Sequence, residues 1–121
     1  MALPSANKRM QGAKGEATAV QYLQRHGYKI LKQNYRYERG EIDIVAEDNN
    51  ELVFVEVKAR HSHAYGMPEE SVTPKKQQQI RTVAEGYLAE HNSNERVCRF
   101  DVIAIDWRGR QTAIRHYRDA F

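Results

Sequence analysis

Two neighbouring apolar segments that carry charged residues constrain the fold of this chain most strongly. Residues 40–46 read GEIDIVA and residues 52–60 read LVFVEVKAR. Both are rich in the β-branched and aromatic residues typical of strands, and the polar residues between them favour a turn. The sequence therefore predicts a β-hairpin. Asp43, Glu56 and Lys58 interrupt its otherwise apolar strands, and charges in such positions need a physical reason.

The expected register of this hairpin brings acidic side chains together. If residues 49–50 form the loop, opposed residues have numbers with a constant sum, and Asp43 faces Glu56. Opposed side chains in an antiparallel pair have Cβ atoms about 4.5 to 5.5 Å apart, and like charges there repel. Strand alternation puts Lys58 on the face of Glu56, with Glu41 opposite it. A three- or five-residue loop would slip the register by one residue and move Asp43 to the other face, so the prediction depends on the turn.

A third acidic side chain is expected from an N-terminal helix. From Ala13 the apolar residues recur at spacings of three and four, and Gly27 is placed to end the helix. Glu16 falls on the apolar face of this pattern, so it is expected to point toward the core or into a cleft. An acid in the first turn is also favoured by the helix dipole alone, and both interpretations stay open here. The expected apolar face consists of Ala13, Ala17, Val20 and Leu23.

The remaining chain adds strands and one more helix. Residues 28–31 read as a short strand and residues 34–39 as a basic connection into the hairpin. A Thr-Pro pair at residues 73–74 marks a helix start, and residues 96–106 and 112–117 read as two further strands. The order of helix, three strands, helix and two strands predicts an α/β or α+β domain with a mixed sheet.

Length and composition bound the class of protein. At 121 residues the chain fits one domain, with residues 1–11 expected to form a flexible basic arm. No apolar run approaches the ~18 residues of a membrane span, and no secretory signal is evident, so we expect a cytoplasmic protein without membrane contact. Cys98 stands alone, which argues against a disulfide or a thiolate zinc cluster. A net charge of +3 suits a polyanionic partner and ordinary solubility equally well.

The acidic residues and the lysine together suit a hard divalent cation. Mg²⁺ prefers carboxylate oxygens and retains waters, so Asp43 and Glu56 are expected as ligands, with Glu16 and the backbone carbonyl of Val57 as further candidates. Such an ion activates water and neutralises charge on phosphoryl oxygens, while Lys58 is placed to orient the water or stabilise the transition state. The pattern predicts phosphodiester hydrolysis with Mg²⁺, or with Mn²⁺ as a substitute.

The hairpin also carries a resemblance to a known superfamily. The sequences GEID at residues 40–43 and VFVEVKAR at residues 53–60 resemble the hairpin of the PD-(D/E)xK nucleases, with Ile42 in place of the name-giving Pro. The resemblance implies an α/β fold with a restriction-endonuclease-like core, in which helices flank a mixed β-sheet, akin to archaeal Holliday-junction resolvases. The active site that it implies consists of Glu16, Asp43, Glu56 and Lys58.

Within that superfamily, nearly the whole chain resembles the small bacterial YraN family of endonuclease-like proteins. The motifs that carry this likeness, besides the hairpin, are Gly15-Glu16, Tyr65-Gly66, the RFDV sequence of residues 99–102 and Ala120-Phe121.

Basic side chains around the expected site predict contacts with nucleic-acid phosphates. We therefore expect a metal-dependent endonuclease of DNA rather than RNA, with branched or structured DNA suggested by the resolvase likeness. A non-catalytic nucleic-acid-binding or DNA-processing partner protein that keeps the fold is the alternative, as is a purely structural ion-pair cluster around Lys58. Symmetric cutting of both strands would require a homodimer. The candidates for phosphate contacts are Arg36, Arg60, Lys75, Lys76 and Arg81.

Overall fold

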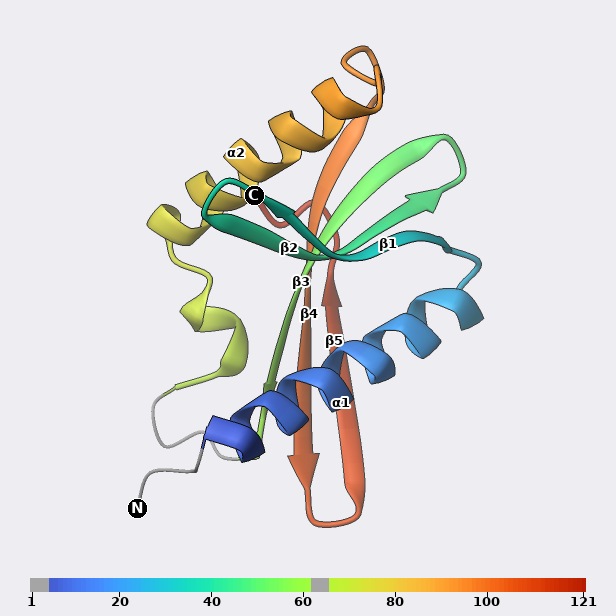
Figure 1. The fold of residues 1–121 in the computed structure, drawn as a ribbon. Helices are drawn as coiled ribbons and strands as arrows, with labels where there is room; N and C mark the ends of the chain where they lie inside the picture. The colour runs from blue at the N-terminus through green and yellow to red at the C-terminus, as the bar shows by residue number, and fades with distance from the viewer. Residues whose placement is uncertain (1–4, 62–65) are drawn as a thin grey trace.

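The fold is a five-stranded sheet with two helices packed on it (Figure 1). The structure, a computed structural model, describes residues 5–61 and 66–121, with side chains from residue 12 onward. In chain order the elements are α1 (Ser5–Arg25), β1 (Lys29–Tyr37), β2 (Gly40–Asp48), β3 (Glu51–Arg60), the 3₁₀-helix η1 (Pro68–Ser71), α2 (Pro74–Glu90), β4 (Cys98–Arg108) and β5 (Gln111–Tyr117).

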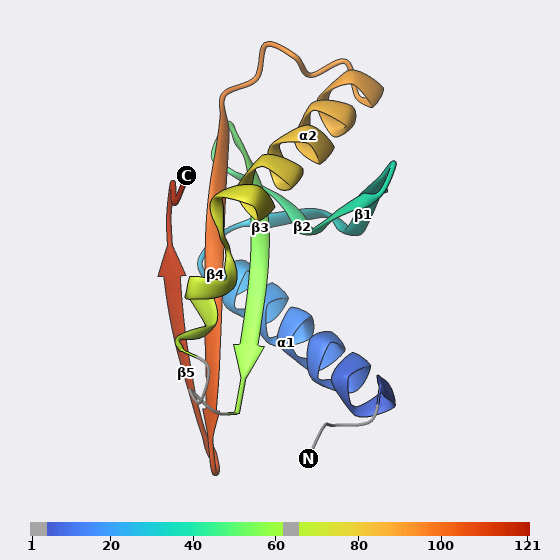
Figure 2. The same ribbon diagram turned by 90° about the vertical axis from the view of Figure 1, so that its left-hand side faces the viewer.

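The sheet is mixed, as the sequence predicted. Its strand order is β1-β2-β3-β4-β5. Strands β3 and β4 run parallel, and the other neighbouring pairs are antiparallel. A parallel pair needs a long crossover, and η1 with α2 supplies it (Figure 2). The result is a mixed α/β architecture that is compatible with a restriction-endonuclease-like core.

Each helix covers its own face of the sheet, so the protein has two apolar cores. The α2-side core joins Ile80 and Val83 of α2 to Phe54 of β3. The α1-side core joins Leu23 of α1 to Val55 of β3 and other strand residues. Because successive strand residues point to opposite faces, β3 is apolar on both sides over its first half. This explains its near-continuous apolar sequence.

Strand β1 is longer than the sequence predicted. The expected basic connection over residues 34–39 is wrong, because residues up to Tyr37 continue the strand, with a bulge between Ile30 and Lys32. The sequence pattern did not indicate a strand here because β1 is an edge strand whose polar residues are exposed, while Tyr35 is buried against α2. Burial of one side of an edge strand leaves a weak apolar signal.

The buried face of α1 also differs from the prediction. Ala13 and Ala17 are exposed, and the helix packs through Gly15, Ala19 and Leu23. A Cβ atom added at Gly15 would lie 3.0 Å from the Cβ of Ala59 on β3. The helix therefore approaches the sheet at a glycine that hydrophobicity alone does not mark. Glu16, next to that contact, still lies on the inward side and is half-buried.

The first residues of the chain leave one prediction open. Residues 5–11 belong to α1, and residues 1–4 lie outside the described residues. The expected basic arm therefore stays a prediction. Among the residues that the structure describes, no helix has the length and apolarity needed to cross a membrane.

Candidate metal centre

The hairpin of β2 and β3 has the predicted two-residue loop. Asn49 and Asn50 form the turn, and Asn49 has a φ of 56°, a left-handed conformation that asparagine tolerates better than most residues. The ladder runs from the pair Asp48 and Glu51 to the pair Ile44 and Val55. The predicted register is thus confirmed, and the next position along it brings Asp43 alongside Glu56.

Beyond Ile44 the strand β2 parts from β3, and the two strands form a fork. The ladder with β3 stops there, while pairing of β2 with β1 continues to Gly40. The side chains of β2 change faces at the same point. Ile42 belongs to the α2-side core, whereas Ile44 belongs to the α1-side core. Residues two apart on a regular strand would share a face, so β2 turns about its axis at Asp43. The predicted pairing of Glu41 with Lys58 is consequently wrong.

At the fork, the side chain of Asp43, instead of the backbone of β2, forms the hydrogen bond to β3. Its Oδ2 accepts a hydrogen bond from the backbone N–H of Val57 at 2.8 Å. In an antiparallel pair the N–H and C=O of one residue point toward the same neighbouring strand. The ligand role expected for the carbonyl of Val57 stays a prediction.

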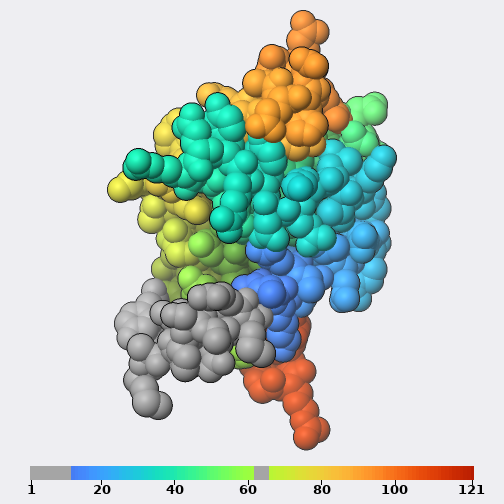
Figure 3. Space-filling view, in the orientation of Figure 1, coloured from blue at the N-terminus to red at the C-terminus, as the bar shows by residue number. Residues whose placement is uncertain are grey.

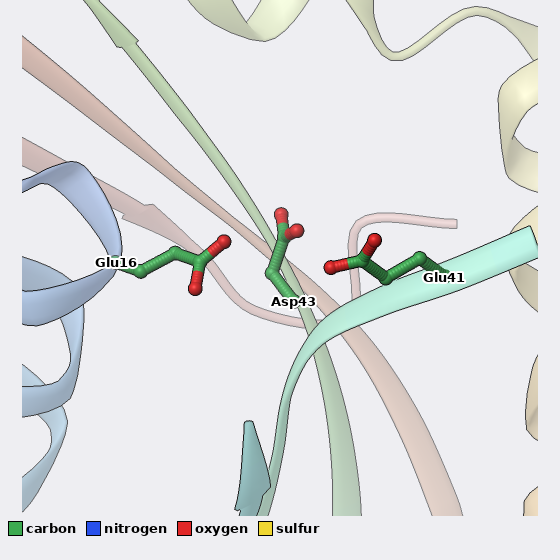
Figure 4. A group of neighbouring side chains, drawn as sticks. All are labelled: Glu16, Glu41 and Asp43. Atoms are coloured by element: carbon green, nitrogen blue, oxygen red, sulfur yellow. The ribbon is translucent and has the colours of Figure 1, made fainter. Parts of the chain in front are cut away.

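Three carboxylates meet at the mouth of the fork. Glu16 reaches in from α1, and Glu41 and Asp43 come from β2 (Figure 4). One oxygen from each side chain lies within 4.8 Å of the others, and all three residues are partly buried. Burial and the neighbouring Asp43 charge raise the pKa of Glu16. Like charges at such distances repel, so the cluster favours a bound cation.

Glu56 adds a fourth carboxylate on the α2 side of β3. The residue is 5% exposed, and its burial, together with the nearby Asp43, raises its pKa to about 8. The Lys58 ammonium lies 3.8 Å from Oε1 and partly offsets this shift. The other oxygen, Oε2, is buried and accepts no hydrogen bond from a described N–H or O–H donor, and the neighbouring Asp43 carboxylate could accept a proton-mediated bond only from protonated Glu56. A buried polar atom in that state costs free energy.

These donors fit a hard divalent cation. Glu56 Oε2 is the kind of buried, unpaired oxygen that a metal ion would satisfy, and the neighbouring carboxylates of Asp43, Glu16 and Glu41 offer the oxygen ligands that Mg²⁺ or Mn²⁺ prefers. The tight group in Figure 4 does not include Glu56. Asp43 is the residue shared by the two acidic neighbourhoods, because it lies next to Glu56 as well.

The residues predicted to contact nucleic acid lie in different surroundings. Lys76 of α2 is close enough to Glu56 to lower its pKa, and Arg36 of β1 pairs with Glu41 at 3.5 Å. Arg81 packs over the rings of Phe100 and Phe121 at 5.9 and 5.3 Å. The structure therefore brings Lys76 and Arg36 to the acidic group. Lys75 and Arg60 are exposed.

Two residues of the centre were not among the predicted site residues. Glu41 precedes Asp43 by two residues, a spacing that marks neighbouring side chains on a strand and was a usable signal. The side chain of Asn34 on β1 lies close enough to Glu16 to lower the pKa of its carboxyl group. Its sequence neighbourhood offered no such signal, because the strand that carries it was not predicted.

Fold and site together define a mixed α/β protein with an acidic cluster that could bind metal. The family model described as "Uncharacterised protein family UPF0102" matches residues 15–105, a range that contains all four acidic residues of the cluster and Lys58. The chain belongs to the UPF0102 family, and the YraN-like resemblance is confirmed at this level.

Its relatives match along almost their whole length. A UPF0102 protein of Geobacter metallireducens is 48% identical over 117 residues, which cover 97% of this chain and 96% of that protein. One from Chlorobium phaeobacteroides is 45% identical over 123 residues, covering 97% of each chain. Another, from Caldicellulosiruptor bescii, is 46% identical over 118 residues, covering 95% of this chain and 99% of its own. These three relatives thus match over nearly the full length of this chain.

Proposed function

We propose that this protein is a metal-dependent endonuclease that hydrolyses phosphodiester bonds of DNA, with branched or structured DNA as its substrate class. The observation that carries the proposal is the fork of β2 and β3, where Asp43 lies beside buried Glu56 with its unpaired oxygen. Lys58 and Glu16 lie next to these acids. This arrangement accords with the resemblance to the PD-(D/E)xK nucleases.

Some residues of the centre would hold the ion, and Lys58 would assist the hydrolysis. Asp43, Glu56 and the carbonyl of Val57 would hold the ion, with Glu16 and Glu41 completing its oxygen ligands directly or through water. When bound, Mg²⁺ supplies an activated water and neutralises charge on the phosphate. Lys58, which is partly buried next to Glu56, would donate to the attacking water or to a phosphate oxygen. A positive group held there stabilises charge that develops in the transition state.

Basic residues on either side of the acids support a polyanionic substrate. Arg36 lies beside Glu41, and Lys76 lies near Glu56 at the first turn of α2. Cations placed on both sides of a metal site position a phosphate backbone rather than read its sequence. A structural ion pair alone explains the centre less well, because Lys58 does not offset the burial and the Asp43 charge that raise the pKa of Glu56.

Cleavage of a DNA panel tests the proposal. Linear, flapped and four-way DNA are incubated with Mg²⁺ or Mn²⁺ and with wild type, Asp43→Asn or Glu56→Gln. We expect cleavage by wild type and a loss of at least about 100-fold in either variant, since each removes a charged metal ligand. Glu85→Gln, an exposed acid on α2, is the matched control and should cut like wild type.

Two outcomes would count against catalysis. Equal activity in wild type and both variants would contradict the proposed site. Binding of the DNA panel without cleavage in either ion would favour the non-catalytic DNA-binding alternative instead.

A further inference from the structure

Asn34 has a backbone conformation that is unusual for its place in a strand. Its φ is 54°, in the left-handed region that asparagine enters more readily than other residues with a side chain. Among the described residues with positive φ, Asn34 alone lies inside a strand. A left-handed residue interrupts extended geometry, and strained backbone of this kind clusters at functional sites.

The interruption lies directly across from Asp43. In the ladder of β1 and β2, Gln33 pairs with Ile44 and Tyr35 pairs with Ile42. The residues between them, Asn34 and Asp43, face one another in this register but form no ladder pair. The same point of β2 is where its pairing with β3 ends. The irregular backbone of Asn34 therefore accompanies the turn of β2 that directs Asp43 into the fork.

The side chain of Asn34 connects this kink to α1. It lies close enough to the carboxylate of Glu16 to lower the pKa of that group, and an oxygen of Glu16 lies within 4.8 Å of oxygens of Glu41 and Asp43. Without an anchor, a glutamate on a helix surface would turn away from two other carboxylates. The neutral amide donates a hydrogen bond without adding charge. Asn34 is itself exposed, so burial in the core does not explain its presence there.

We propose that Asn34 is a positioning residue of the metal centre: its side-chain amide holds Glu16 beside Asp43, and its left-handed backbone permits the kink that turns Asp43 into the fork. The inference rests on the proposed metal-dependent function and assigns to β1 a part in it. Residues that orient metal ligands typically change metal affinity 10- to 100-fold when they are replaced.

Substitutions at position 34 separate the two contributions. Glycine keeps the left-handed backbone at no steric cost but lacks the amide. Alanine lacks the amide and also disfavours the backbone. Gln33→Gly is the matched control, because Gln33 is an exposed neighbour on the same strand that pairs regularly with Ile44.

Mn²⁺ affinity measured by calorimetry in a double-mutant cycle tests the proposal. We expect Asn34→Gly to weaken binding about 10-fold, Asn34→Ala to weaken it at least as much, and Gln33→Gly to leave it unchanged. Because Asn34 acts through Glu16, adding Asn34→Gly to Glu16→Gln should cause no further loss. Unchanged affinity in Asn34→Gly, or losses that add up in the double variant, would overturn the proposal.

A metal-free measurement keeps this test apart from that of the proposed function. The side-chain NH₂ resonances of Asn34 in an ¹⁵N correlation spectrum should move when Glu16 is replaced by Gln, because the carboxylate acceptor is lost. Resonances that do not move would contradict the inference whatever the metal does. If they move while wild type binds no Mn²⁺, the proposed function fails and the positioning contact stands.

Discussion

The side chain of Glu56 is almost completely buried and lies near a second carboxylate, that of Asp43. Burial is the largest cause of its raised pKa, and Asp43 adds to it. Lys58 at 3.8 Å only partly compensates. A structural protein would gain stability by replacing such a group with an apolar or neutral one. The cost that Glu56 imposes on the metal-free fold is therefore consistent with a role in binding.

The raised pKa of Glu56 predicts how stability depends on pH. The unfolded chain ionises this group above its ordinary value of 4.5, whereas the folded chain keeps the proton up to about 8. The unfolded state then binds fewer protons, so the unfolding free energy falls as pH rises from 5 to 8. The contribution is at most about 5 kcal/mol, because one pKa unit corresponds to about 1.4 kcal/mol.

Thermal unfolding in EDTA at pH 5 to 8.5 measures this effect. Glu56→Gln removes the ionisation, so its stability relative to wild type should increase with pH across that window. Glu85→Gln, at an exposed position, should track wild type. A difference between Glu56→Gln and wild type that stays constant with pH would refute the account of Glu56.

At the level of single residues, the sequence predicted part of the candidate metal centre. Asp43, Glu56 and Lys58 were evident because charges inside apolar strands are conspicuous and register arithmetic pairs them. Glu41 was placed opposite Lys58, a position that the departure of β2 from β3 prevents. The role proposed for Asn34 depends on the backbone conformation of that one residue, which no pattern of residue types predicts.

The fork depends on how the β1–β2 hairpin lies against α2. A Cβ atom added at Gly40 would overlap Val83, and one added at Gly86 would overlap the ring of Tyr37. These two glycines let the strands approach the helix closely, and Figure 3 shows the β1–β2 surface adjoining that of α2. The contact involves the half of β2 that no longer pairs with β3, so α2 lies beside the mouth of the centre.

Replacing Gly86 with alanine tests this packing. Alanine favours a helix over glycine by about 1 kcal/mol, but overpacking costs about 1 to 3 kcal/mol, and the overlap with the Tyr37 ring should prevail. We expect Gly86→Ala to lower the unfolding free energy in urea titrations. Gly12→Ala, where an added Cβ would meet nothing within 4 Å, should raise it by up to about 1 kcal/mol. Stabilisation by both variants would show that the helix and hairpin are not closely packed.

The helices and the central hairpin were predictable as elements because their signals are local. A Thr-Pro start, a terminal glycine and a polar turn each act within a few residues. The direction in which β2 leaves β3 was not predictable. It depends on contacts between β1 and α2, which are far apart in the sequence and meet only in the folded chain.

Across the whole molecule, one acidic centre draws on three elements, and a separate hydrogen-bond network surrounds Asp101 on the α1 side of β4. Asp101 of β4 is fully buried and accepts hydrogen bonds from Arg99 at 2.9 and 3.0 Å, His116 at 2.7 Å and the backbone N–H of Asp119 at 3.0 Å. Burial alone would raise the pKa of Asp101, but the bonds from His116 and Arg99 outweigh it and lower that pKa. Asp101 is thus a fully partnered buried acid, whereas Glu56 is a partly unpartnered one.

That contrast makes the fork the candidate place for a bound cation. The element order and mixed sheet followed from the sequence, whereas the grouping of Glu16, Glu41 and Asp43 required the close approach of α1 at Gly15. We therefore expect the fork to bind a divalent metal ion through Asp43.

Calorimetric titration of Mn²⁺ into wild type and Asp43→Asn at pH 8 tests this claim most directly. We expect saturable binding to wild type and at least about a 10-fold weaker affinity in Asp43→Asn, with both proteins folded to the same extent by circular dichroism. Absence of binding to wild type, or equal affinity in the two proteins, would contradict a metal centre at the fork.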